Sequence, residues 1–189
     1  MAHGNEIKEW QRRISLYDDE LAYKELFLHC YPPLLKFAVS FVKVAEVAEE
    51  VVSDVFISLW ERRRQLEEVN NLQVYLYVSV KNTALKYLFK QKKQVSITID
   101  DLSVELASPH QNPEQQLLTT EMMERITAAI EGLPPRCKVI FKLIREDGLK
   151  YKEIAEILNI SVKTIDNQLA VALAKIARAL NVQLKKPVR

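Results

Sequence analysis

The stretch YKEIAEILNISVKTIDNQLAVAL, residues 151–173, decides how the second half of this chain folds. Its apolar residues recur at three- and four-residue steps on both sides of a polar interruption at Asn159, which is typical of two amphipathic helices joined by a tight turn. Ser161 is the expected N-cap of the second helix, since its hydroxyl can accept a hydrogen bond from an amide of the first turn. With the small Ala155 at the crossing point, the pattern predicts a helix-turn-helix. The positions expected to face inward are Ile154, Leu158, Ile160, Val162, Ile165, Leu169 and Leu173.

Polar side chains gather where the second helix begins, at Lys163, Thr164, Asn167 and Gln168. Lysine donates to guanine, Asn and Gln pair with adenine through two hydrogen bonds, and threonine offers a methyl group to thymine. The second helix of a helix-turn-helix enters the DNA major groove with its N-terminal residues against the base edges. We therefore predict that these residues, with Ser161, bind DNA. The alternative is a plain helical hairpin whose start is merely solvated.

Composition favours an all-α chain. Of 189 residues, 48% are hydrophobic and 28% charged, with only three glycines and seven prolines, which suits one or two small helical domains. No apolar run is long enough to cross a bilayer and the start lacks a signal-peptide core, so a cytoplasmic location without membrane insertion is expected. The two cysteines and three histidines are scattered, which predicts no metal site, no cofactor and no catalytic centre. They are Cys30, Cys137, His3, His29 and His110.

A first helical block runs from about residue 7 to residue 93. Residues 21–42 predict two helices separated by a break at Pro32–Pro33, because proline removes a helical hydrogen bond. Residues 48–63, AEEVVSDVFISLWERR, form an amphipathic helix, and residues 70–94 predict a helix that starts at an Asn-rich cap. The apolar stripe of the middle segment is Val52, Val55, Phe56, Leu59 and Trp60.

Periodicity fails from Gln94 to Gln116, where β-branched, acidic, Ser, Asn and Pro residues mix, so we predict a linker there. A second block then starts with a helix capped by Thr119 or Thr120, restarts at Pro134–Pro135 and closes that next helix at Gly148. The predicted organisation is a domain at 1–93, a linker at 94–116 and a domain at 117–189.

Limited proteolysis should therefore cut first between residues 94 and 116 and release two helical fragments, because that stretch has no apolar face to anchor it. Mass spectrometry of the early fragments measures the cleavage sites. Cuts concentrated between residues 50 and 90 would mean that the domain boundary is misplaced.

Net charge is only +2, but its distribution is uneven. Residues 46–54 carry four acidic side chains and no basic one, whereas residues 71–93 carry five lysines and no acidic side chain. This asymmetry suggests two different partners, one of them polyanionic. The alternative is that both clusters are ordinary solvated helix faces.

Two stretches together resemble a known family. AEEVVSDVFISLWERR followed by NNLQVYLYVSVKNTALKYLFKQKKQ is similar to the second conserved region of bacterial sigma factors of the extracytoplasmic-function group. IEGLPPRCKVIFKLIREDGLKYKEIAEILNISVKTIDNQLAVALAKIARAL resembles their fourth conserved region. The resemblance covers about residues 20–93 and 117–180, in the family's order and with a linker between. It implies a sigma factor that binds core RNA polymerase, directs it to promoters and helps to melt the −10 element.

The resemblance also implies site residues. The helix around residues 51–60 would dock on the polymerase through Glu50, Asp54, Ser58 and Glu61, and the helix-turn-helix would read the −35 element. The next helix of the first domain would hold the melted −10 element, with the loop QLEEVNNLQ (65–73) as one wall of a pocket for an extruded base. The −10 positions are Asn71, Tyr75, Lys81, Asn82, Lys86 and Lys90. Tyr75, Tyr77 and Tyr87 are available for stacking, although each also fits a core position, Tyr87 most of all.

Three departures from the family pattern matter. Family members often carry Trp at the position of Tyr75. They often have Ser or Thr where Lys150 stands, so the first helix of the motif would fray or be capped by Asp147. The recognition helix lacks the usual basic residues through its middle, where Ala170, Val171, Leu173 and Ala174 stand. Fewer phosphate contacts imply weak DNA binding by the isolated second domain. The additional apolar side chains could instead bind the polymerase or an anti-sigma factor. Whether this protein has an anti-sigma partner is left open by the sequence.

Three rivals remain. The helix-turn-helix also suits a response regulator or quorum-type factor, but residues 7–93 lack the strand-like runs of their upstream domains. An enzyme acting on nucleic acid is disfavoured because no paired-carboxylate, His–Cys or Gly-rich phosphate motif is present. A protein that only mimics a sigma factor would bind partners without starting RNA synthesis, and a transcription assay separates it.

Overall fold

The computed structural model describes residues 3–91 and 118–180, and the regular structure within them is entirely helical. The expected all-α fold is confirmed for this part of the chain. The predicted linker lies outside the described residues. The described residues form two compact units, one drawn mainly from residues 3–91 and the other mainly from residues 118–180. The elements are α1 (His3–Tyr17), α2 (Glu20–Val42), α3 (Ala45–Glu61), the 3₁₀ helix η1 (Arg63–Glu68), α4 (Leu72–Gln91), α5 (Leu118–Glu131), α6 (Pro135–Arg145), α7 (Tyr151–Leu158) and α8 (Val162–Ala179).

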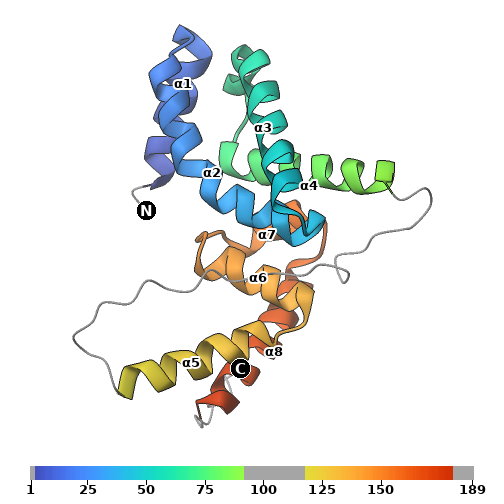
Figure 1. Ribbon diagram of the computed structural model, residues 1–189. Coiled ribbons are helices and arrows are strands. Elements are labelled where there is room, and N and C mark those ends of the chain that lie inside the picture. The colour runs from blue at the N-terminus through green and yellow to red at the C-terminus, as the bar shows by residue number, and fades with distance from the viewer. Residues whose placement is uncertain (1–2, 92–117, 181–189) are drawn as a thin grey trace. The chain divides into compact units, whose positions relative to one another are not determined.

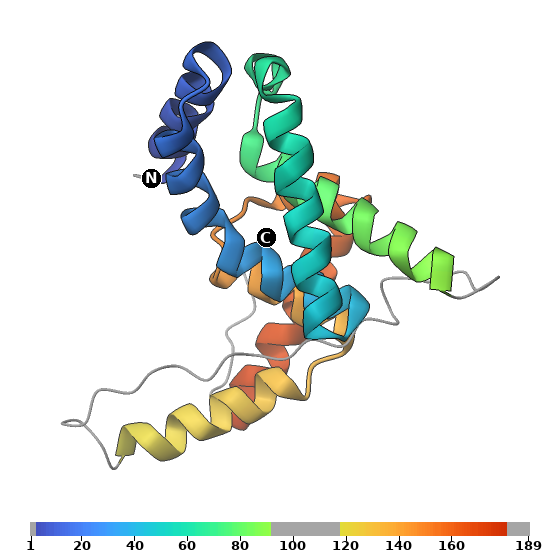
Figure 2. The same cartoon turned by 45° about the horizontal axis from the view of Figure 1, so that its top comes forward.

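The first unit is built around α2, which packs against α1, α3 and α4. Figures 1 and 2 show α1 and α2 as an antiparallel pair. The sequence pattern did not single out α1, because its buried face is narrow and partly polar. That face consists of Ile7, Gln11, Ile14 and Ser15.

The predicted break at Pro32–Pro33 is wrong, since α2 continues through both prolines to Val42. Each proline removes a backbone amide and costs about 3 kcal/mol in a helix interior. Burial on both sides of the pair offsets that cost. Leu26 and Cys30 before it and Leu34 and Phe37 after it are all at most 5% exposed. Because both halves of α2 enter one core, the helix continues through the prolines.

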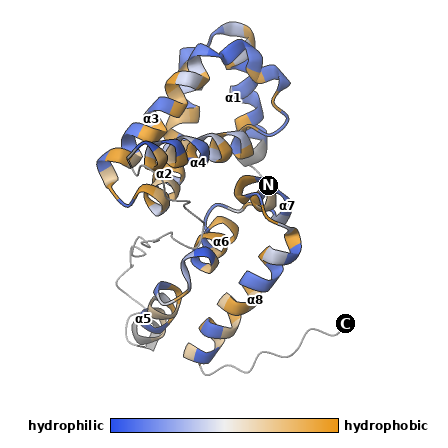
Figure 3. Ribbon diagram, turned by 90° about the vertical axis from the view of Figure 1, so that its right-hand side faces the viewer, coloured by the Kyte–Doolittle hydropathy of each residue, from blue (hydrophilic) through white to orange (hydrophobic). Residues whose placement is uncertain are grey.

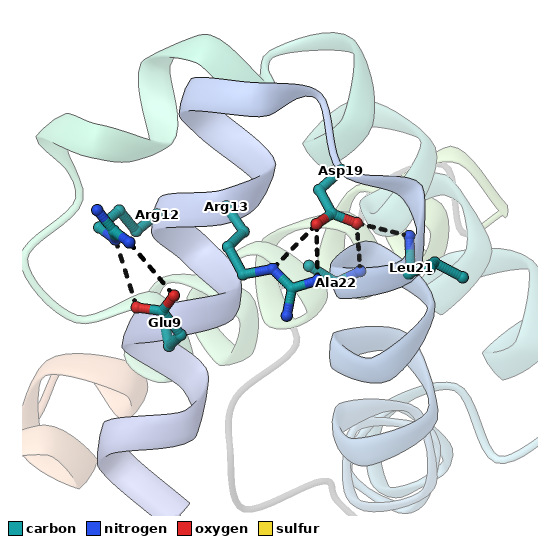
Figure 4. A network of polar contacts seen from close by, with 6 residues as sticks. All are labelled: Glu9, Arg12, Arg13, Asp19, Leu21 and Ala22. Atoms are coloured by element: carbon teal, nitrogen blue, oxygen red, sulfur yellow. Dashed lines mark hydrogen bonds and ion pairs between the residues drawn. The ribbon is translucent and has the colours of Figure 1, made fainter.

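Polar groups stabilise the turn between α1 and α2 (Figure 4). One oxygen of the Asp19 carboxylate accepts hydrogen bonds from the amides of Leu21 and Ala22, both at 3.0 Å. The Arg13 guanidinium donates to the other oxygen at 2.7 and 2.9 Å. The bond from Ala22 and then the one from Arg13 lower the pKa of Asp19 below its ordinary value. The carboxylate therefore caps α2 and ties it to α1.

The second unit is organised by α8, against which α5 and α6 pack. Leu133, Cys137 and Ala172 form its buried cluster, and Ile130 and Phe141 pack on it. The α6 helix starts at Pro135, as the prolines predicted, and Gly148 follows its end with φ of 65°, a value that suits glycine.

The expected threonine cap of α5 is wrong, because this helix begins at Leu118 and takes in both Thr119 and Thr120. A threonine inside a helix costs well under about 1 kcal/mol relative to alanine, so the helix can extend past a possible threonine cap.

Candidate nucleic-acid and polymerase interfaces

The helix-turn-helix forms where the sequence predicts it. The turn between α7 and α8 passes through Asn159 with φ of 54°, and the amide of Ile160 donates to the carbonyl of Ala155 at 3.0 Å. Ser161 is the N-cap of α8, and its hydroxyl accepts from the amide of Thr164 at 3.1 Å. The hydroxyls of Ser161 and Thr164 also pair with each other at 2.8 Å. The predicted cap is confirmed, and both hydroxyls are engaged in it.

The start of α7, which the sequence predicted to fray or to be capped by Asp147, is held by Glu153. A carboxylate oxygen of Glu153 accepts from the amide of Lys150 at 2.7 Å, and the Lys150 carbonyl accepts from the amide of Ile154 at 3.0 Å. A glutamate at the third helical position can reach back to the amide of the N-cap residue. Glu153 thus ties down the start of α7 through the amide of Lys150, a different donor from the first-turn amides that a Ser or Thr cap would bind.

The start of α8 exposes three of the predicted DNA-binding residues, Ser161, Lys163 and Asn167. Lys163 and Asn167 are exposed and lie four residues apart, hence on one face. Thr164 and Gln168 are half-exposed, while the carbonyl of Gln168 accepts from the thiol of Cys137 at 3.0 Å. The structure therefore exposes Lys163 and Asn167, with Ser161, and holds Thr164 and Gln168 closer to the body of the unit.

The inward assignment along α8 is partly wrong. Ile165 is fully buried, but Val162 and Leu173 are 37% and 45% exposed. Ala172 is buried in place of Leu173, because consecutive helical residues point about 100° apart and only one of them can face α5 and α6. Helix faces are thus set by the partner helices as well as by periodicity.

The α8 ribbon includes hydrophobic residues along its length (Figure 3), and some of their side chains are exposed. Val171, one turn beyond Asn167 on the same face, is 49% exposed. Lys175, the next basic residue, donates to the backbone carbonyl of Gly132. The scarcity of phosphate-binding groups noted in the sequence is therefore also a property of this helix surface.

One face of α4 gathers most of the predicted −10 residues. Tyr75, Asn82, Lys86 and Lys90 follow one another at steps of seven, four and four residues, which keeps them on one side of a helix. Asn82, Lys86 and Lys90 are exposed and Tyr75 is half-exposed. Asn71, one turn before Tyr75, is exposed and caps α4 by accepting from the amide of Val74 at 3.1 Å. The expected Asn cap is confirmed.

Lys81 does not share that face. It lies about 100° around the helix from Asn82, is half-buried, and its pKa is lowered by burial, since removal from water disfavours the charged ammonium. The structure thus separates Lys81 from the other −10 candidates.

The aromatic residues of α4 differ in burial from the sequence expectation. Tyr77 is only 2% exposed, and its ring meets Phe37 edge-on with centroids 5.0 Å apart, so it belongs to the core. Tyr87 is half-buried. Phe89, which the sequence pattern did not single out, is 52% exposed. It stands seven residues after Asn82, and that two-turn spacing is the signal that would have placed it on the same face.

The loop between α3 and α4 is attached to α1. The side-chain amide of Gln11 donates to the carbonyls of Leu66 and Val69 at 2.6 and 2.7 Å. Asp18, in the turn between α1 and α2, pairs with Arg63 and, at 3.6 Å, with Arg64. The loop that the family resemblance assigns to base capture is therefore fastened from the N-terminal side of the chain.

The outer face of α3 holds the four predicted polymerase-binding residues in one line, at steps of four, four and three. Glu50, Asp54 and Glu61 are exposed and Ser58 is half-exposed. The opposite face is the predicted apolar stripe, and Val52, Val55, Phe56 and Leu59 are each at most 5% exposed. Trp60 lies at its margin, half-buried between the Tyr23 ring, with centroids 4.9 Å apart, and the Arg63 guanidinium.

Within the described residues, no three His, Cys, Asp or Glu side chains lie so that they could hold a metal ion together. The helices described are also too short or too polar for any of them to span a bilayer.

Two helical units, the second with a helix-turn-helix, define a DNA-binding protein of the transcription apparatus. The family description "Sigma-70 region 2" matches residues 26–94, and "Sigma-70, region 4" matches residues 123–176. The chain belongs to the sigma-70 family, in its extracytoplasmic-function group, and acts in transcription initiation through RNA polymerase. Proteins of this family bind core RNA polymerase and promoter DNA.

Known relatives agree with this assignment. The sigma-E factor of the extracytoplasmic-function group from Escherichia coli K12 is 25% identical over 158 residues, which cover 80% of this chain and 82% of the relative. A probable RNA polymerase sigma factor, RfaY of Xanthomonas campestris pv. campestris, is 22% identical over 161 residues. Those residues are 84% of this chain but only 40% of the Xanthomonas protein.

Solved structures show the same fold. The sigma factor RpoE of Bartonella quintana, crystallised with the anti-sigma factor NepR, superimposes with a TM-score of 0.54 at 21% identity, covering 86% of this chain and 98% of its own. CnrH, solved with the cytosolic domain of CnrY, superimposes with a TM-score of 0.57 at 16% identity, covering 93% of this chain and 97% of its own.

Proposed function

We propose that this sigma factor melts the −10 element on the outer face of α4, reads the −35 element with the start of α8, and binds the polymerase through the outer face of α3. The organisation follows from this: residues 1–93 act as region 2, residues 117–189 as region 4, and residues 94–116 as the linker. The face of α4 carries the proposal, because basic, amide and aromatic side chains line up there without an acidic one.

The chemistry of that face suits a single strand. Lysines along a helix attract the phosphate backbone, while flat rings stack on unpaired bases regardless of their identity. Lys86 and Lys90 would supply the first contact, and Tyr75 and Phe89 the second. Half-buried Lys81 would contribute less, because its ammonium group is partly withdrawn from solvent.

The decisive test is transcription by the reconstituted holoenzyme. Core polymerase with this chain should start RNA at a defined set of promoters, and sequencing the 5′ ends of the transcripts locates them. Permanganate should then modify unpaired thymines in the −10 element of those promoters. Specific binding of core polymerase without RNA synthesis or permanganate reactivity on any DNA would contradict the proposal and favour a protein that only mimics a sigma factor.

An anti-sigma factor is proposed as a further partner. Two proteins of the same fold were solved with partners, the sigma factor RpoE with the anti-sigma factor NepR and CnrH with the cytosolic domain of CnrY. Val171, exposed on the same side of α8 as Asn167, is an apolar side chain that a partner protein could cover.

Asp54→Arg should weaken holoenzyme assembly by about tenfold, because it places a cation at the centre of an acidic face proposed to meet a basic surface. Titration of labelled core polymerase, with circular dichroism as the check on folding, measures it. Glu49→Arg is the matched control, since it makes the same charge change at an exposed residue about 140° around α3. Equal affinities for both variants and the parent would remove the face around Asp54 from the interface.

A further inference from the structure

Gln11 is a polar residue in the buried face of α1, with only 9% of its surface exposed. Its side-chain nitrogen lies 2.6 Å from the carbonyl oxygen of Leu66 and 2.7 Å from that of Val69. These two carbonyls belong to a turn that is more than fifty positions away in the sequence. A buried amide with two such short contacts is an attachment between distant parts of the chain.

The chemistry of the two partners determines how this amide is oriented. Both are carbonyl oxygens, which only accept, so the NH₂ group of Gln11 must face them and both of its hydrogens are used. The Leu66 carbonyl also accepts from the amide of Val69 at 3.0 Å, which closes the turn itself. Gln11 therefore bridges the two ends of one turn and holds it in a single conformation.

A second attachment lies at the other end of the same loop. The Arg63 side chain pairs with Asp18 and donates to the carbonyl of Trp60 at 3.0 Å, and its guanidinium lies over the Trp60 ring at 4.6 Å. The hydrogen bond from Arg63 lowers the pKa of Asp18 below its ordinary value. The loop is thus held at both ends by α1 and the turn that follows it.

We infer that α1 acts as a clamp for this loop, and that Gln11 is a positioning residue that presets the wall of the pocket for an extruded −10 base. The inference rests on the proposed −10 function of the loop. Ordering several backbone residues only when the base arrives would cost conformational entropy at that moment. A turn already held by Gln11 avoids that cost, so the bridge should strengthen capture of the base while leaving contacts to the phosphates unchanged.

Gln11→Met removes the two donors but keeps an unbranched side chain of similar length. Gln11→Glu, the second variant, keeps the shape and turns an acceptor toward both carbonyls. Leu16→Met is the matched control, because it introduces the same residue on the same helix at a side chain that is 49% exposed. Circular dichroism melting of each full-length variant shows whether it is folded.

The measurement uses holoenzyme and a single-stranded −10 oligonucleotide from a promoter found by start-site sequencing. A series of oligonucleotides carries an abasic site at each position of the −10 element in turn. At each position, the affinity for the intact oligonucleotide divided by the affinity for the abasic one reports how strongly that base is captured. At the captured position this ratio should fall about tenfold in Gln11→Met, at least as far in Gln11→Glu, and not at all in Leu16→Met.

Three outcomes would overturn the inference in distinguishable ways. If the parent holoenzyme binds every abasic oligonucleotide as tightly as the intact one, base capture itself fails, and the inference fails with it. If the parent captures a base and Gln11→Met keeps the parent ratio, base capture stands and the clamp is wrong. If Gln11→Met loses affinity equally for intact and abasic strands, Gln11 only supports the fold.

Discussion

Asn167→Ala should cost this sigma factor about 1–3 kcal/mol on its preferred −35 element and relax the choice of base at one position, as loss of a base-reading pair does. Asn167 is exposed in the second turn of α8, and its amide carries no charge for a phosphate. An amide of this kind pairs with adenine through two hydrogen bonds in the major groove. The measurement is a competition of randomised −35 elements for the variant and parent holoenzymes.

Two neighbouring substitutions separate base reading from general attraction. Lys163→Ala should weaken binding to all elements alike and reduce its dependence on salt, because a lysine that neutralises a phosphate releases a counterion. Asp166→Ala, at an exposed residue about 100° from Asn167, should strengthen binding slightly and without preference. Gln168→Ala should also relax the choice of base at one position of the −35 element. If the preferred element is unchanged in the variants of Asn167, Gln168, Lys163 and Thr164, α8 does not read it.

Phe56→Ala should lower the free energy of unfolding of the first unit by about 3–5 kcal/mol, the usual cost of removing a buried phenyl ring and leaving a cavity. Phe56 is 2% exposed, and its ring meets Phe27 and Tyr23 edge-on, with centroids 4.8 and 6.2 Å apart. A domain of this size loses about 4–8 °C in melting temperature for each kcal/mol. Thermal unfolding should therefore move down by more than about 10 °C, and holoenzyme yield should fall with it.

Ile57→Ala is the matched control for that measurement, because its side chain is the next one along α3 and is 57% exposed. Its removal should change the melting temperature little, since substitutions at exposed positions usually stay within about 0.5 kcal/mol. Equal losses in the two variants would mean that α3 does not pack as described.

Local signals in the sequence predicted elements wherever a few neighbouring residues suffice. The Ser161 cap, the Asn71 cap and the buried stripe of α3 each depend on spacing within one or two helical turns, and all three are confirmed. Pro32–Pro33 failed as a break because the cost of a proline is local, whereas the burial that offsets it comes from α3 and α4. The sequence left Tyr77 open between core and stacking and gave no role to Phe89 for a similar reason, since only the neighbours of α4 decide which ring is covered.

By itself, then, the sequence determined an all-helical chain, a helix-turn-helix in its second half and the family to which both halves belong, because helical periodicity and caps are properties of adjacent residues. Only the tertiary structure decided which polar residues act together. It placed Tyr75, Asn82 and Lys86 on one open face and turned Lys81 away from them. It also brought Gln11 to a turn more than fifty residues further along the chain. Such a contact leaves no local pattern, since a buried amide finds its partners through the packing of α1 against η1, which periodicity within either segment cannot encode.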